Sequence, residues 1–224
     1  ELEAMLSGPD SAPPDEATMD RVHFVINNVT PQNVDEKWRD LDAALKPEIY
    51  VWFGNYLVVK RVATQPNFHV VYRTLLNKMA RKRLNKLVLL CTVLNVRKLL
   101  ASDKIKTSAQ ERSLLKNLGM WLGKLTVAQD KPLLLRYIDL KEMLCEAYET
   151  GRLIACVPFV AKILEACTES RVIKPPNPWL MALMATLREL YELPDLKLNL
   201  KFAVEVLCKA LKMEVTDIAP SSVL

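Results

Sequence analysis

The sequence is poor in the residues that β-rich folds and catalytic sites most often need. Only five glycines occur in 224 residues, too few for the many tight turns of a β-rich fold. There are two histidines, and no dinucleotide-binding GxGxxG, phosphate-loop or HExxH motif is present. Nothing marks the orienting group or oxyanion site that a Ser or Cys nucleophile would need. We therefore expect no enzyme, no cofactor and no catalytic residue.

The cysteines also lack a pattern that would indicate a metal site or a disulfide framework. Five occur, widely scattered and without a CxxC pair, so no zinc site is predicted. They are interpreted as reduced thiols that pack in the core. No signal peptide and no apolar run long enough to span a bilayer is evident. These absences predict a soluble, intracellular protein.

The thirteen prolines fall mostly just ahead of segments with apolar residues at helical spacing. Pro31, Pro47, Pro66 and Pro178 each precede such a run, and proline at the first helical position removes an N–H that would lack a partner. No lasting alternation of period two occurs. We expect ten helices, at residues 15–28, 30–45, 47–63, 66–80, 83–101, 108–129, 139–150, 152–169, 177–192 and 199–212.

Local signals support several helix ends and one interruption. Ser108 with Glu111 forms a capping box, in which each side chain bonds the other residue's backbone N–H. Asp139 with Glu142 repeats this pattern. Pro158 lies inside the helix expected at 152–169 and predicts a kink or a split there.

The helix expected at 108–129 has one packed face and one spare face. Gly119 and Gly123 are spaced by four residues, so they share a side on which another helix can come close. Asn117 and Lys124 lie off the leucine stripe, and Trp121 lies at its edge. We expect these three side chains to be free for a partner.

Ten amphipathic helices with short connections are typical of antiparallel helix pairs. The fold class predicted is all-α, an α-solenoid of about five HEAT-like helix pairs. A large globular helical bundle is the competing interpretation. Residues 1–14 lack any period and are expected to be a flexible leader, followed by a single domain at 15–220.

Positive charge is concentrated in one part of the chain. The Lys60–Lys106 flank contains twelve Lys and Arg residues and one acidic residue, Asp103, so it carries +11 while the whole chain carries +5. This asymmetry indicates an anionic partner, either RNA, phosphate or an acidic protein face. The run Arg81–Lys86 is its densest part, but no aromatic residue interleaves it, which disfavours stacking of unpaired bases there.

Two short stretches have both a structural and a functional interpretation. Phe68 and Tyr72 fall on an apolar stripe and are expected in the core, while Asn67 and His69 fall at its edges. Trp179 follows a stiff proline-rich corner. It is either buried at an elbow between helix pairs or exposed as a docking point, because a stiff corner loses little entropy on binding.

Several segments together resemble a known family, the central domain of the scaffold subunit of the CCR–NOT deadenylase complex. That domain is related to the middle domain of translation initiation factor four-G. The run Arg81–Lys86 is more cationic than the family pattern. The resembling segments are YLVVKRVATQPNFHVVY (56–72), LLASDK (99–104), RSLLKNLGMWLGKLT (112–126), VPFVAKILE (157–165), PPNPWLMALM (175–184) and DLKLNLKFAVEVLCKAL (195–211).

The resemblance implies a non-catalytic scaffold of five HEAT-like pairs. It implies a CAF-type deadenylase on one surface, expected on the outer sides of helices in the first half. It also implies a DEAD-box helicase of the translational-repressor and decapping class on a separate concave surface, with stimulation of the helicase ATPase. Other scaffold regions and CCR–NOT subunits are further expected partners. The implied location is the cytoplasm, including P-bodies, with the nucleus left open.

Helical faces and the resemblance together give a predicted helicase face. The alternative function is an RNA-binding HEAT adaptor that grips phosphates with the Lys60–Lys106 flank; RNA contact and a membrane partner are otherwise not expected. The residues of the predicted helicase face are Lys60, Arg61, Asn67, His69, Tyr72, Arg73, Asn117, Trp121, Lys124 and Trp179.

Overall fold

The computed structural model describes residues 4, 6 and 11–224, and in these residues all regular structure is helical. The predicted leader at 1–14 lies mostly outside the described residues. The chain divides into two compact units, residues 1–95 and 96–224, whereas the sequence predicts one domain at 15–220, which stays a prediction. None of the described helices is long and apolar enough to cross a membrane.

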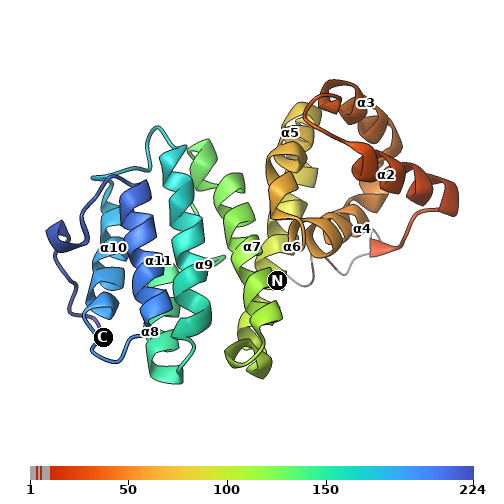
Figure 1. The fold of residues 1–224 in the computed structure, drawn as a ribbon. Coiled ribbons are helices and arrows are strands. Elements are labelled where there is room, and N and C mark those ends of the chain that lie inside the picture. Colours follow the sequence, from red (N-terminus) through yellow and green to blue (C-terminus); the bar gives the residue numbers. More distant parts are fainter. Residues whose placement is uncertain (1–3, 5, 7–10) are drawn as a thin grey trace. The chain divides into compact units, whose positions relative to one another are not determined.

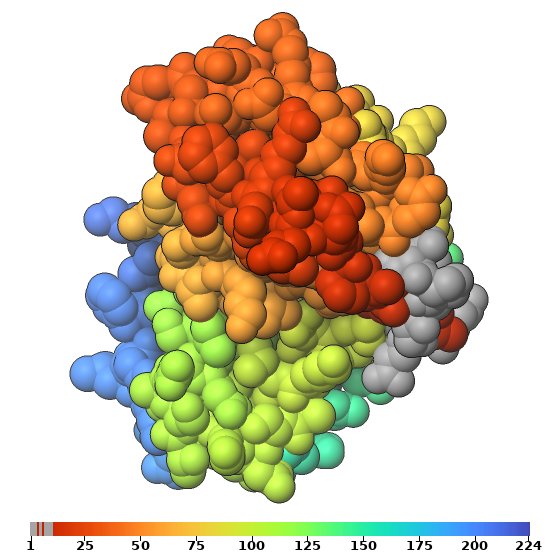
Figure 2. Space-filling model, turned by 90° about the vertical axis from the view of Figure 1, so that its right-hand side faces the viewer, coloured from red at the N-terminus to blue at the C-terminus, as the bar shows by residue number. Residues whose placement is uncertain are grey.

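The first unit contains the helices of the N-terminal half. They are α2 (Glu16–Asn28), α3 (Val34–Ala44), α4 (Tyr50–Asn55), a π-helix η3 (Tyr56–Val62), α5 (His69–Met79) and most of α6 (Lys82–Ala101), with 3₁₀ turns η2 (Pro47–Ile49) and η4 (Pro66–Phe68). Helix α3 packs against both α2 and α5. Figure 2 shows α2 and α3 together on the face of this unit that is turned to the viewer.

The second unit contains the remaining helices in two layers. Helices α7, α9 and α11 lie side by side, while α8 and α10 lie behind them (Figure 1). This packing of successive pairs is typical of an α-solenoid and confirms the predicted all-α class. The elements are α7 (Ala109–Leu125), α8 (Leu140–Thr150), α9 (Leu153–Glu165), α10 (Pro178–Tyr191) and α11 (Leu198–Ala210), with 3₁₀ turns η5 (Asp103–Lys106), η6 (Val127–Gln129), η7 (Ala166–Thr168) and η8 (Val215–Asp217).

Two of the proline predictions need correction. Pro47, Pro66 and Pro178 do lie at the first positions of helical segments. Pro31 instead lies in a turn, because Asn33 Oδ1 accepts a hydrogen bond from the Thr30 N–H at 2.7 Å and α3 begins only at Val34. The split predicted at Pro158 is wrong, because α9 is continuous through it and most of its side chains are buried; the alternative of a kink stays a prediction. Proline has no backbone N–H, so Pro158 cannot donate the usual helical hydrogen bond, and the packing of α9 on several sides compensates for this loss.

The capping box at the start of α7 is half formed. The Glu111 N–H donates to Ser108 Oγ at 3.2 Å, as predicted. The Ser108 N–H, however, donates to the Lys104 carbonyl at 2.7 Å, so it does not need the Glu111 carboxylate. The preceding turn η5 supplies this acceptor. At α8, Asp139 Oδ1 accepts from the Glu142 N–H at 3.1 Å, so the same half of the second predicted capping box is formed.

The two glycines of α7 let it approach α9 closely, as their spacing predicts. A Cβ added at Gly119 would lie 2.9 Å from both the carbonyl oxygen and Cδ2 of Phe159. One added at Gly123 would lie 2.8 Å from Ala166 Cβ and 2.9 Å from the Ile163 carbonyl oxygen. Both distances are too short for a real side chain, so glycine is required at both positions by the neighbouring backbone.

Replacing Gly119 by alanine is expected to destabilise the protein, although alanine favours helix by about 1 kcal/mol. Overpacking against a backbone carbonyl costs roughly 1–3 kcal/mol, so we expect a net loss of about 1 kcal/mol, at the middle of a range of roughly 0–2 kcal/mol. The measurement is thermal unfolding followed by circular dichroism. Ser113→Ala, at an exposed position of the same helix, is the control and should not lower the midpoint. A Gly119→Ala variant as stable as this control would contradict the close-packing argument.

Candidate partner-binding surfaces

The described residues contain no cluster of His, Cys, Asp and Glu that could hold a metal ion. The five cysteines form no disulfide, and burial raises the pKa of the Cys156 and Cys167 thiols to about 12. A thiol with such a pKa is almost fully protonated at neutral pH and is a poor nucleophile.

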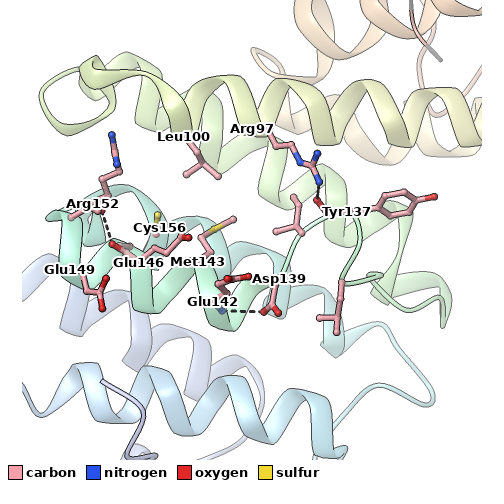
Figure 3. Close-up of a pocket in the computed structure, with 14 residues that line it drawn as sticks. Arg97, Leu100, Tyr137, Asp139, Glu142, Met143, Glu146, Glu149, Arg152 and Cys156 are labelled. Carbon is pink, nitrogen blue, oxygen red and sulfur yellow. Dashed lines mark hydrogen bonds between the residues drawn. The ribbon is translucent and has the colours of Figure 1, made fainter. Parts of the chain in front are cut away.

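A cleft of about 650 Å³ in the second unit lies between the end of α6, the 135–139 loop, α8 and the start of α9 (Figure 3). Arg97 on its wall donates to the Tyr137 carbonyl at 2.6 Å, which ties the loop to α6. Glu142, Glu146 and Met143 line the cleft from α8, and Cys156 from α9. With the thiol protonated and the arginine bound to backbone, the cleft offers carboxylates and apolar surface but no activated nucleophile.

Two residues predicted to belong to the helicase face, His69 and Tyr72, lie in the core of the first unit. His69 is fully buried, and its Nε2 donates to the Val62 carbonyl at 2.8 Å. Val62 is the last residue of the π-helix, so no backbone N–H of the same helix can donate to its carbonyl. The His69 side chain supplies the donor instead. Tyr72 is buried and donates to Gln65 Oε1 at 2.8 Å, and burial raises the pKa of its phenol. The predicted core position of Tyr72 is therefore confirmed, and the assignment of His69 and Tyr72 to the helicase face is wrong, because neither side chain reaches the surface.

The other predicted residues of the first unit are accessible. Lys60 and Asn67 are exposed, and Arg61 and Arg73 are partly exposed. Arg61 Nε donates to Tyr56 Oη at 3.1 Å, so its side chain leans along the π-helix.

Phe68, expected in the core, is instead exposed and stacks on Tyr72 with ring centroids 6.0 Å apart. It lies in the 3₁₀ turn η4, where the helical spacing used for the prediction does not hold. We name the exposed residues of η3, η4 and the first turn of α5 the η3–α5 patch: Val59, Lys60, Asn67, Phe68 and Val70.

In the second unit, the predicted spare face of α7 is largely covered. Trp121 is fully buried and Asn117 is 8% exposed, so the prediction that they lie off the core is wrong. Helix α7 packs on α9 through the side that carries Gly119 and Gly123, and its buried residues extend around most of the helix to Asn117 and Trp121, so no spare face remains there. Lys124 is only partly exposed, and its Nζ lies 3.2 Å from Glu169 Oε1.

Trp179 is partly exposed at the proline-rich corner that begins α10. The Asn177 side chain caps this helix by accepting from the Leu180 N–H at 3.2 Å. The preceding loop is held by Asp130, whose Oδ1 accepts from Ser170 Oγ and from the Arg171 N–H, each at 2.7 Å. The corner is therefore stiff, as its prolines predict, and it keeps part of an aromatic side chain at the surface.

The basic Lys60–Lys106 flank contains both structural and exposed cations. Arg81 Nη1 donates at 2.6 Å to both the Leu45 carbonyl and Tyr50 Oη, and its Nε lies 2.7 Å from Asp42 Oδ1. The neighbouring Lys82 and Lys86 are exposed. The first residue of the Arg81–Lys86 run thus holds the first unit together, whereas Lys82 and Lys86 are exposed to an anionic partner.

Sequence reasoning missed an aromatic surface on α2 and α4. Phe24 is 60% exposed, with Lys37 Nζ 5.6 Å from its ring centroid. The ring of His23 lies 4.6 Å from that of Tyr56, which stacks at 5.7 Å on Trp52. Phe24 lies opposite the buried stripe of α2, which comprises Val22, Val25 and Ile26. Helical spacing could therefore have identified it. We name Phe24 of α2, together with the neighbouring Lys37 of α3, the α2 patch.

Replacing Asp130 by asparagine is expected to loosen the loop before Trp179. The hydrogen bonds from Ser170 and from the Arg171 and Val172 N–H groups lower the pKa of Asp130 below its ordinary 3.8. A lowered pKa stabilises the folded loop above the ordinary value and ceases to do so as the pH falls through the folded pKa. Asparagine still tolerates the left-handed backbone at this position (φ 58°). Its side-chain oxygen carries no charge, however, so the hydrogen bonds that it accepts are weaker than those of a carboxylate.

The measurement is hydrogen exchange at the Arg171 and Val172 amides. We expect roughly fivefold faster exchange in Asp130→Asn, after correction for the intrinsic pH dependence. In the native protein we expect the exchange of these amides to speed up only at acid pH, where the Asp130 carboxylate becomes protonated. Asp130→Asn should not show this change with pH. Asp195→Asn, in another exposed loop of the same unit, is the control. Unchanged protection in Asp130→Asn would show that the carboxylate does not hold the loop.

Comparison with known proteins gives one consistent result. The family model described as the CCR4-NOT transcription complex subunit 1 CAF1-binding domain matches residues 10–224. The chain is 37% identical over 225 residues to the CCR4-NOT transcription complex subunit let-711 of Caenorhabditis elegans, with 97% of this chain and 8% of the relative covered. It is similar to general negative regulator of transcription subunit 1 of Schizosaccharomyces pombe (36%, covering 92% and 10%) and of Saccharomyces cerevisiae (38%, covering 95% and 10%). The chain thus spans about a tenth of these relatives, and it belongs to the family of CAF1-binding domains of CCR4-NOT transcription complex subunit 1.

Proposed function

We propose that this chain is the part of a CCR4-NOT scaffold subunit that docks a CAF1-type deadenylase. The observation that carries the proposal is the match to the CAF1-binding family over residues 10–224, which includes nearly every residue that the structure describes. The scaffold is non-catalytic, and the packing fits that role, because stacked helices present extended surfaces whose side chains are fixed by a rigid core.

The α2 patch is our candidate deadenylase surface. It lies on the outer side of a helix in the first half of the chain, where we expect this partner to bind. Phe24 exposes a large apolar ring beside the charge of Lys37. Interfaces are usually dominated by a few aromatic anchors that become buried on binding, surrounded by a polar rim.

A second partner, a DEAD-box helicase that represses translation and promotes decapping, would use a different surface. The η3–α5 patch contains Lys60 and Asn67 of the predicted helicase face in the first unit, and Trp179 with Lys124 is the accessible part of that face in the second. Their lysines would steer association with an acidic partner. Binding both helicase lobes would set their relative position and so stimulate the ATPase. Such a scaffold would couple deadenylation to repression in the cytoplasm, including P-bodies, and in the nucleus.

RNA binding through the Lys60–Lys106 flank is the second candidate function. The exposed Lys82 and Lys86 favour it, whereas the hydrogen bonds and the ion pair of Arg81 remove one cation from it. Phosphate binding should weaken steeply and log-linearly with salt, while a protein interface with aromatic anchors should weaken only modestly.

Calorimetric titration with a CAF1-type deadenylase, before and after saturation with the helicase, tests the two-partner proposal. We expect binding at the same affinity in both titrations, because the two patches lie on different elements. Phe24→Ser should weaken deadenylase binding by about tenfold or more. Leu135→Ser, at an exposed apolar position of the second unit, is the matched control. Loss of deadenylase binding after saturation would mean that the surfaces overlap.

Charge reversal separates the helicase from the RNA interpretation. Lys60→Glu, on the η3–α5 patch, should weaken helicase binding by roughly fivefold to tenfold through slower association. Lys86→Glu, an exposed lysine of the same flank outside the patch, should leave it unchanged. If both variants instead weaken binding of a single-stranded RNA about equally, with helicase binding intact, the flank binds phosphate and the helicase assignment is wrong.

A further inference from the structure

Helix α11 has an apolar stripe on its outward side. Leu198 is 81% exposed, Phe202 63% and Val206 39%. They are spaced by four residues, so they lie along one side of the helix. The buried side chains of α11 lie on the opposite side: Leu200, Val204, Leu207 and Cys208. Large exposed apolar side chains in a row are unusual on a monomer surface and indicate an interaction site.

The packing of the second unit decides which side of α11 is buried. Helix α9 lies between α7 and α11, so the buried side of α11 faces α9 and the stripe faces away from it (Figure 1). The segment after α11 does not cover the stripe but bonds to α10: the Ser221 N–H donates to the Ala185 carbonyl at 3.0 Å, and Ser221 Oγ donates to Glu189 Oε2 at 2.6 Å.

The charges around the stripe select the kind of partner. Residues 197–212 contain four lysines and one acidic residue, Glu205, a net charge of +3. Glu205 accepts a hydrogen bond from Tyr191 Oη at 2.6 Å, and Lys201 lies over the same ring at 5.5 Å. Two copies of α11 placed together would bring these lysines face to face, so self-association is disfavoured. An acidic surface is complementary.

A groove of about 530 Å³ beside the start of α11 adds a second apolar element with the same charge preference. Its walls include Tyr148, Ile154, Leu196 and Leu200, and its lysines are Lys106 and Lys197, opposed by Asp195 alone. Leu196 and Leu200 flank Leu198 in the sequence. The groove and the stripe therefore share one end of α11.

We infer that the outer face of α11 docks an acidic amphipathic helix from a partner protein. Such a helix would lay leucine-like side chains at three- and four-residue spacing on Leu198, Phe202 and Val206, and its carboxylates would meet Lys201 and Lys209. The inference goes beyond the proposed function, because neither the α2 patch nor the η3–α5 patch includes α11. A failure of either proposal leaves the other unchanged.

The test uses fluorescence anisotropy with a labelled helical peptide of about 18 residues that has leucines at this spacing, glutamates beside them and alanines elsewhere to keep it helical. A peptide with lysines in place of the glutamates is the charge control. We expect the acidic peptide to bind more tightly. Phe202→Gln should weaken it by about tenfold or more, whereas Val172→Gln, at a 66% exposed position in another part of the same unit, should not.

Charge reversal gives the sharper result. The double variant Lys201→Glu with Lys209→Glu should prefer the lysine peptide over the acidic one. Equal binding of both peptides, no binding of either, or an unchanged affinity in Phe202→Gln would overturn the inference. Sedimentation of the free protein tests whether a second copy of the chain binds the stripe. A dimer that dissociates in Phe202→Gln would show that it does, and would overturn the inference.

Discussion

The close contact between α7 and α9 is the constraint on which the second unit depends. Gly119 and Gly123 bring the α7 backbone within van der Waals distance of Phe159, Ile163 and Ala166. At this separation α9 is enclosed on most sides, which is why it stays continuous through Pro158. Helix α11 packs on the other side of α9. The direction in which α11 turns its exposed side chains therefore follows from this packing.

The first unit is held partly by polar anchors at irregular backbone. The π-helix η3 ends with a carbonyl that His69 satisfies, and the segment around Leu45 and Asp42 is held by the Arg81 guanidinium. Buried backbone acceptors must find donors, and long basic side chains can supply them where no helix continues. In a sequence, polar residues such as His69 and Arg81 look like binding residues, although their side chains are used to hydrogen-bond the protein's own backbone.

What remains for partners is a set of separate surfaces rather than a pocket with reactive groups. The Cys156 and Cys167 thiols are buried and protonated, and the Arg97 guanidinium at the cleft is bound to backbone. The accessible features are aromatic or aliphatic side chains next to lysines, at the α2 patch, the η3–α5 patch, the Trp179 corner and the outer face of α11. Affinity at such surfaces comes from burying the apolar side chains, and the lysines favour a partner with negative charge.

The sequence by itself determined the helical class, the approximate position of each helix, the close approach at Gly119 and Gly123, and the family. These depend on local spacing, capping and a few specific motifs, which act over three to four residues. Tertiary structure decided which side chains remain at the surface. Trp121 and His69 are buried and Phe68 is exposed, because burial depends on how many helices pack around an element and on 3₁₀ and π segments that break the regular spacing. A helical wheel has one inner and one outer side, whereas α7 and α9 are covered on several sides.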